Sequence, residues 1–236
     1  MGPGIQQPTT GQGGEGSSLA DVFKVLYEPG AVFERVRGRP SFLMPYLVIC
    51  VVQLAIFFLN MPFMKAGMAA QMATRPAGGP DPSKFLWIGA IFIPLSFGLI
   101  LVIAGGLLWV LVSVLGGEAK FGTLMGVAAL SSIPSTILLS IVGTIVLHLQ
   151  GTGQITSMQD LQPALGLDLL VPARGFLGAA LKGINPFSIW GFVLTAIGVS
   201  TTQPLSKSTG YIVAAISLLI GLCIAGVFGA IGNRGS

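Results

Sequence analysis

The sequence predicts an all-α integral membrane protein, a polytopic transmembrane helical bundle of five spans with short interfacial amphipathic helices. Of the 236 residues, 53% are hydrophobic and only 8% are charged. Soluble domains carry about 25% charged residues, and a water-facing surface cannot be built from so few. The apolar residues also fall into five runs that approach the length needed to cross a bilayer. The length suits one bundle rather than separate domains.

The first 18 residues, MGPGIQQPTTGQGGEGSS, differ from the rest in composition. They are mainly Gly, Gln, Pro, Thr and Ser, with almost no apolar side chains. Such a segment cannot bury enough surface to offset the entropy lost on ordering. We expect a disordered tail over residues 1–18.

Residues 19–44 predict two short amphipathic helices. Ser18 and Asp21 have the spacing of a capping box, which marks the start of the first helix. The Glu28-Pro29-Gly30 step ends that helix. Both helices are too short and too charged to span, so we expect them to lie in the membrane interface.

The second of these helices combines an apolar face with basic side chains. Val32, Phe33 and Val36 form the apolar face. The basic side chains around it are Arg35, Arg37 and Arg39. Arginines at an interface meet anionic head groups, so these three are candidate lipid head-group contacts. The alternative is that the helices only cover the cytoplasmic ends of the spans.

A five-span domain is predicted over residues 45–231. Its apolar runs cover residues 45–59, 85–115, 124–149, 187–202 and 210–231. At 1.5 Å per residue the second run would reach about 46 Å, against about 30 Å of hydrocarbon. It therefore tilts, projects beyond the bilayer, or bends at Pro94.

A long connection, residues 150–184, separates the third run from the fourth. Its first part is polar, and its second part carries an apolar stripe that begins at Phe176 and ends at Ile184. Arg174 and Lys182 flank this stripe. The pattern predicts a helix lying on the membrane surface. A re-entrant element is the alternative.

Asn185 and Pro186 directly precede the fourth run, and Trp190 lies near its start. Asn is a favoured N-cap, Pro a favoured first helical residue, and Trp is enriched at membrane interfaces. We predict a structural hinge here. The competing hypothesis is that these residues line a groove for a ligand or lipid. Ser132 and Pro134, inside the third run, are further candidates for a hinge or groove.

Small residues in the last run share one helical face. Gly221, Ala225 and Gly229 are spaced by four, which lets another helix approach closely. We interpret them as a helix-packing face within the bundle. Self-association into a homo-oligomer is the alternative.

The sequence offers no constellation for catalysis, a metal or a cofactor. His148 is the only histidine and has no second histidine or carboxylate near it. No Asp, Glu, Lys or Arg falls within the core of a run, which argues against an ion-coupled transporter. A passive pore or a lipid pathway stays open. No basic run alternates with aromatic residues, so nucleic acid is not an expected partner.

Three stretches resemble bacterial Yip1-domain membrane proteins. They are VLYEPGAVFERVRGRPSFLMPYLV, LGGEAKFGTLMGVAALSSIPSTI and INPFSIWGFVLTAIGVSTTQPLSKSTG, in that order. The resemblance covers roughly residues 20–231. It implies five spans in a helical bundle with the N-terminus in the cytoplasm, here in a bacterial inner membrane.

Orientation is poorly determined by charge alone. With five spans, six lysines and arginines would fall on each side. The arginines just before the first span favour a cytoplasmic N-terminus.

The resemblance also sets the functional expectation. Eukaryotic relatives are linked to vesicle traffic and Rab-type GTPases, but their long acidic and aromatic N-terminal region has no counterpart here. We therefore do not expect GTPase binding. The leading hypothesis is a non-enzymatic protein of membrane organisation, trafficking or scaffolding, whose partners are membrane lipids and an unidentified protein. A passive conduit for lipid or small solutes, such as a channel, transporter or scramblase, is the alternative.

Overall fold

The computed structural model describes residues 18–73, 85–171 and 173–232. Helices make up most of these residues, and no strand occurs among them. The all-α fold predicted by the sequence is therefore confirmed. Of the tail expected over residues 1–18, everything except Ser18 lies outside the described residues.

Three helical stretches are long and apolar enough to cross a membrane. They are α5 (Leu86–Val114), the stack of α6 (Phe121–Ser131), η2 (Pro134–Leu138) and α7 (Leu139–Gln150), and α10 (Lys207–Gly232). If each of two bent helix pairs counts as one span, two further spans are added. These pairs are α3 (Leu43–Leu59) with α4 (Met61–Ala73), bent by 57°, and α8 (Gly175–Gly183) with α9 (Pro186–Thr202), bent by 63°. The described helices thus form a polytopic bundle.

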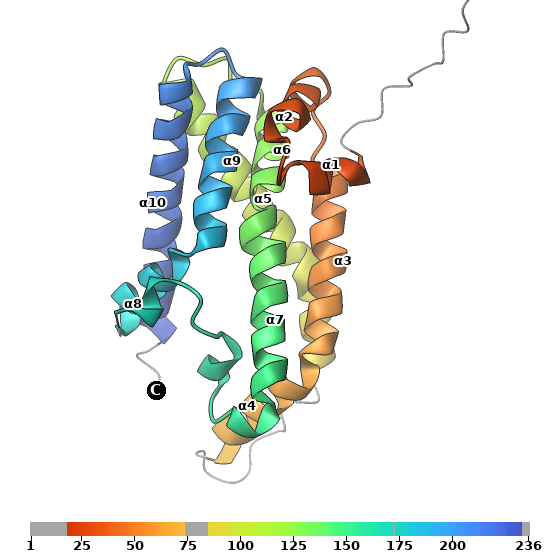
Figure 1. Cartoon of the computed structure of the whole chain (residues 1–236), viewed down its shortest axis with the longest axis vertical. Coiled ribbons are helices and arrows are strands. Elements are labelled where there is room, and N and C mark those ends of the chain that lie inside the picture. Colours follow the sequence, from red (N-terminus) through yellow and green to blue (C-terminus); the bar gives the residue numbers. More distant parts are fainter. Residues whose placement is uncertain (1–17, 74–84, 172, 233–236) are drawn as a thin grey trace, which may run out of the picture.

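The chain runs up and down along the long axis of the bundle (Figure 1). Helices α1 (Leu19–Lys24) and α2 (Pro29–Gly38) lie at the upper end of that view. Helix α4 lies at the lower end, and α8 and the last turns of α10 lie in the lower half above it. We call the upper end the α2 end and the lower half, which contains α8, the α8 end. The first and last described helices therefore approach opposite ends.

The core is centred on α6, at the α2 end. Every residue from Thr123 to Ser131 is buried. Helix α2 packs its apolar face against this core, so that Val32 and Phe33 are both 0% exposed. Gly198 of α9 makes this packing close, because a Cβ there would lie 3.0 Å from the Phe33 ring. The apolar stripe of α2 is thus part of the bundle core.

Helix α5 carries a tryptophan near each end. Trp87 is 60% exposed and Trp109 is 43% exposed. They are 22 residues apart, which is about 33 Å along a helix and close to the thickness of the hydrocarbon core. Indole rings favour the two interfaces, so the pair marks out the apolar layer. Pro94 does not interrupt this helix.

The lower half of α10 packs against α8 through small residues. A Cβ on Gly229 would lie 2.4 Å from the Ala179 Cβ, and one on Gly226 would lie 2.6 Å from the Phe176 ring. Gly221, in contrast, has open space around it. Of the predicted packing face, Gly229 therefore contacts α8, whereas Gly221 faces away from the described residues.

We predict that Gly229→Ala destabilises the protein and that Gly221→Ala does not. The new methyl group at position 229 must displace α8, and such overpacking costs about 1–3 kcal/mol. Both changes gain the same helix propensity, so Gly221→Ala is a matched control. Thermal unfolding of the purified protein in detergent measures the difference. Equal melting temperatures for the two variants would contradict the packing.

We also predict that reporters fused at Gly14 and Gly235 report opposite sides of the membrane, with Gly14 in the cytoplasm. An odd number of spans requires this result, and the arginines of α2 set its direction. Phosphatase and fluorescent-protein fusions measure it in cells. Both reporters on one side would mean an even number of spans.

Candidate functional site

A groove of about 670 Å³ opens at the α8 end of the bundle. Its walls come from α3, α7, α8, α10 and the connection between α7 and α8. The polar residues that line it are Asn60, Ser140, Thr144, Gln162, Lys182 and Asn185. Its apolar and small residues include Leu139, Gly143, Leu147, Leu165, Ala225, Phe228 and Gly229. We call it the α7–α10 groove.

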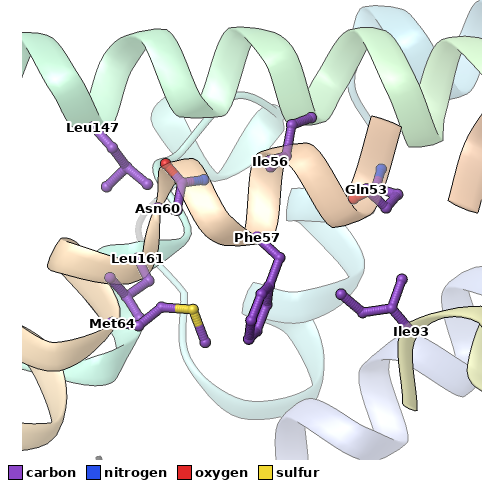
Figure 2. A pocket seen from close by; sticks show the side chains of 8 residues that line it. All are labelled: Gln53, Ile56, Phe57, Asn60, Met64, Ile93, Leu147 and Leu161. Carbon is purple, nitrogen blue, oxygen red and sulfur yellow. The ribbon is translucent and has the colours of Figure 1, made fainter. Parts of the chain in front are cut away.

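A smaller cavity of about 260 Å³ adjoins this groove at α3 (Figure 2). The two share Ile56, Asn60, Leu147 and Leu161. Figure 2 shows Phe57 and Met64 on one side of α3, whereas the Asn60 amide lies on the side toward α7. Asn60 therefore stands where the two spaces meet.

Polar side chains join the α3 region to η2 and α7 beside these cavities. Gln53 donates to the Thr136 carbonyl oxygen (2.7 Å) and to Ser140 Oγ (3.0 Å). Asn60 Nδ2 donates to Thr144 Oγ1 (2.9 Å). The partners recur every four residues, so they share one helical face. Such interhelical hydrogen bonds contribute about 0.6–2 kcal/mol each.

Ser132 caps the C-terminal end of α6 and Pro134 begins the π-helical turn η2, and both lie away from the groove lining. Ser132 Oγ donates to the Ala129 carbonyl oxygen of its own helix (2.9 Å). Pro134 is buried, and α9 approaches this region closely at Gly191, where a Cβ would lie 2.9 Å from the Ser131 carbonyl oxygen. The turn therefore belongs to the contact between the α6–η2–α7 stack and α9.

Asn185 fits both of the roles that the sequence left open for it, that of a helix cap and that of a groove residue. Its Oδ1 accepts from the backbone N–H groups of Phe187 (3.1 Å) and Ser188 (2.9 Å), so it caps α9, which begins at Pro186. It is 5% exposed and also lines the groove. Trp190, in the first turns of α9, is 37% exposed and lies outside the groove lining.

Lys182 is the charged residue of the groove, and sequence reasoning did not single it out as a site. Its Nζ donates to the Gln162 carbonyl oxygen (2.5 Å), which joins α8 to the wall of the groove. Asn185 Nδ2 donates to the Lys182 carbonyl oxygen (3.2 Å). The signal that could have identified it is a lysine set among small and apolar residues just before a span.

The connection between α7 and α8 is held in place by hydrogen bonds to the Asp160 carboxylate. Asp160 accepts from the Thr156 and Ser157 backbone N–H groups, both at 2.8 Å, and from the Thr156 hydroxyl (2.9 Å). The backbone hydrogen bond from Thr156, followed by that from its hydroxyl, holds the pKa of the Asp160 carboxyl below its usual range. This fixes the loop before Leu161 and Gln162.

The three arginines named from the sequence lie at the other end of the bundle. Arg35 pairs with the buried Asp21 carboxylate, and its Nε donates to Asp21 Oδ1 at 3.1 Å. The Arg35 side chain is still 47% exposed. Arg37 and Arg39 are exposed. Their contact with lipid head groups stays a prediction.

Comparison with known proteins gives one family. The Yip1 domain matches residues 23–228 of the chain. A relative described as "Membrane protein YknW", from Bacillus subtilis (strain 168), is 26% identical over 219 residues, which are 86% of this chain and 87% of that protein. No solved structure matches the chain.

We predict that Asn185→Ala lowers thermal stability slightly and that Asn185→Asp is tolerated. Loss of an N-cap costs about 0.5–2 kcal/mol, whereas aspartate caps as well as asparagine does. Melting temperature and lipid retention, measured on the same purified variants, separate a hinge from a ligand contact. Lost retention with an unshifted melt would show that Asn185 acts in the groove instead.

Proposed function

The chain belongs to the Yip1-domain family of integral membrane proteins, and we propose that it acts as a non-enzymatic scaffold in membrane organisation or trafficking. It works from the bacterial inner membrane, with its N-terminus in the cytoplasm. Its partners are membrane lipids and a second protein that docks on the membrane surface at the α2 end.

The observation that carries this proposal is the way α2 is held. Its apolar residues are buried in the bundle core, with Val32 and Phe33 at 0% exposure. Glu34 and Arg37 of α2, and Arg39 directly after it, are exposed. The Arg35–Asp21 pair ties α2 to α1. A charged face on a backbone fixed in this way suits docking, because little backbone order remains to be gained on binding.

A passive conduit for lipid or small solutes is the second candidate, and the α7–α10 groove favours it. The opposing observation is the filled core at the α2 end, where α6 is buried from Thr123 to Ser131. A groove at one end with a packed core at the other supports a scaffold more than a path through the bundle.

Reconstitution separates the two functions. For a scaffold, we expect liposomes with the full chain to show the same lipid flipping and small-solute leakage as protein-free liposomes. Fluorescent-lipid reduction and dye release measure these rates. Acceleration of either rate in proportion to protein content would favour the conduit.

A photo-crosslinking residue tests the docking surface directly. Placed at Arg37 in cells, it should give a discrete protein adduct. That adduct should disappear when Arg39 is changed to Glu, since rim charges steer association. The control position is Leu99, which is 59% exposed on α5 and faces the apolar layer. Lipid adducts alone at both positions would contradict a protein scaffold at α2.

A further inference from the structure

We infer that the α7–α10 groove binds one phospholipid of the surrounding bilayer, with its phosphate at Lys182 and an acyl chain between α7 and α10. The inference concerns the end of the bundle opposite α2, so it does not depend on the proposed scaffold. The volume of the α7–α10 groove, about 670 Å³, falls within the range of roughly 300–1,000 Å³ typical of ligand pockets.

The groove opens onto the lipid-facing surface. Phe228 lines it and is 69% exposed, and its neighbour Val227 is 51% exposed. On the α7 side, Ile141 and Ile145 flank the lining residues and are 40% and 53% exposed. Large apolar side chains exposed on spanning helices face hydrocarbon, so the molecule that meets this opening is a lipid.

Lys182 supplies the polar end of the site. Among the described residues that line the groove, it is the only charged one. An ammonium group has three N–H donors, and one of them reaches the Gln162 carbonyl oxygen. The Asp168 carboxylate, whose Oδ1 accepts from the Gly166 N–H (3.0 Å), attracts the same ammonium charge from outside the groove lining. The remaining donors suit a phosphodiester oxygen, which takes strong hydrogen bonds from a cation.

The space next to Lys182 suits an acyl chain. Leu139, Gly143 and Leu147 recur every four residues on α7, opposite Ala225 and Phe228 of α10. Ser140 and Thr144 also reach this wall, but their hydroxyl oxygens already accept hydrogen bonds from Gln53 and Asn60. The glycine makes room, because a Cβ at position 143 would come no nearer than 3.8 Å to its neighbours.

Two variants act on different parts of the proposed lipid. Lys182→Met removes the cation that meets the phosphate, and Gly143→Leu fills the acyl path. Lys182→Arg keeps the charge. Lys207→Met is the matched control, because Lys207 is an exposed lysine at the start of α10, near the other end of the bundle.

The measurement is native mass spectrometry of the full chain in mild detergent, with phosphatidylglycerol or phosphatidylcholine added. We expect one retained phospholipid on the wild type, on Lys182→Arg and on Lys207→Met. We expect retention to fall about tenfold or more in Lys182→Met, because the lost partner is charged. Gly143→Leu should also lose it. Melting temperatures on the same samples check that each variant is folded.

Three results would overturn the inference. One is equal retention by Lys182→Met and the wild type. Another is retention of detergent in place of phospholipid on every variant. The third is a wild-type mass that shows a second copy of the chain but no lipid, which would make the groove a protein interface. If Lys182→Met does not fold, loss of lipid by a folded Gly143→Leu variant decides the question.

Discussion

The whole structure depends on one constraint: inside hydrocarbon, each backbone polar group must find its partner within the protein. Unbroken helices meet it automatically, but this bundle breaks its helices at several places. Asn185 caps α9 where the chain turns from α8. Gln53 reaches the Thr136 carbonyl oxygen in the π-helical turn. Asn60, at the bend between α3 and α4, bonds Thr144. These three amide side chains thus lie at, or bond to, places where regular helix geometry is interrupted.

The same constraint explains why the two ends of the bundle differ. At the α2 end, straight helices and small residues allow a filled core around α6. At the α8 end, the chain bends between α3 and α4 and between α8 and α9, and α7 faces α8 and α10 across a groove. Asn60 and Asn185, the polar residues at these two bends, both line that groove.

The sequence predicted those features that depend on local pattern. Apolar runs located the spans, and Asn185-Pro186 marked the start of α9 because capping involves residues two and three positions apart. The groove could not be predicted, since its walls come from residues between positions 56 and 229 that only the tertiary fold brings together. The Arg35–Asp21 pair crosses a helix break whose geometry no spacing rule provides. The bend angles of 57° and 63° likewise depend on packing.

The burial of α2 bears on how the protein is made. Synthesis proceeds from the N-terminus, so α2 leaves the ribosome before any span has formed. Its partners α6 and α9 follow about 90 and 150 residues later in the chain. The loops between α2 and these helices therefore cannot close until those residues have been synthesised. During that interval Val32, Phe33 and Val36 have no protein partner, and the membrane surface is the apolar phase within reach. We therefore expect α2 to complete the bundle only after α9 is inserted, as a late closing step in biogenesis.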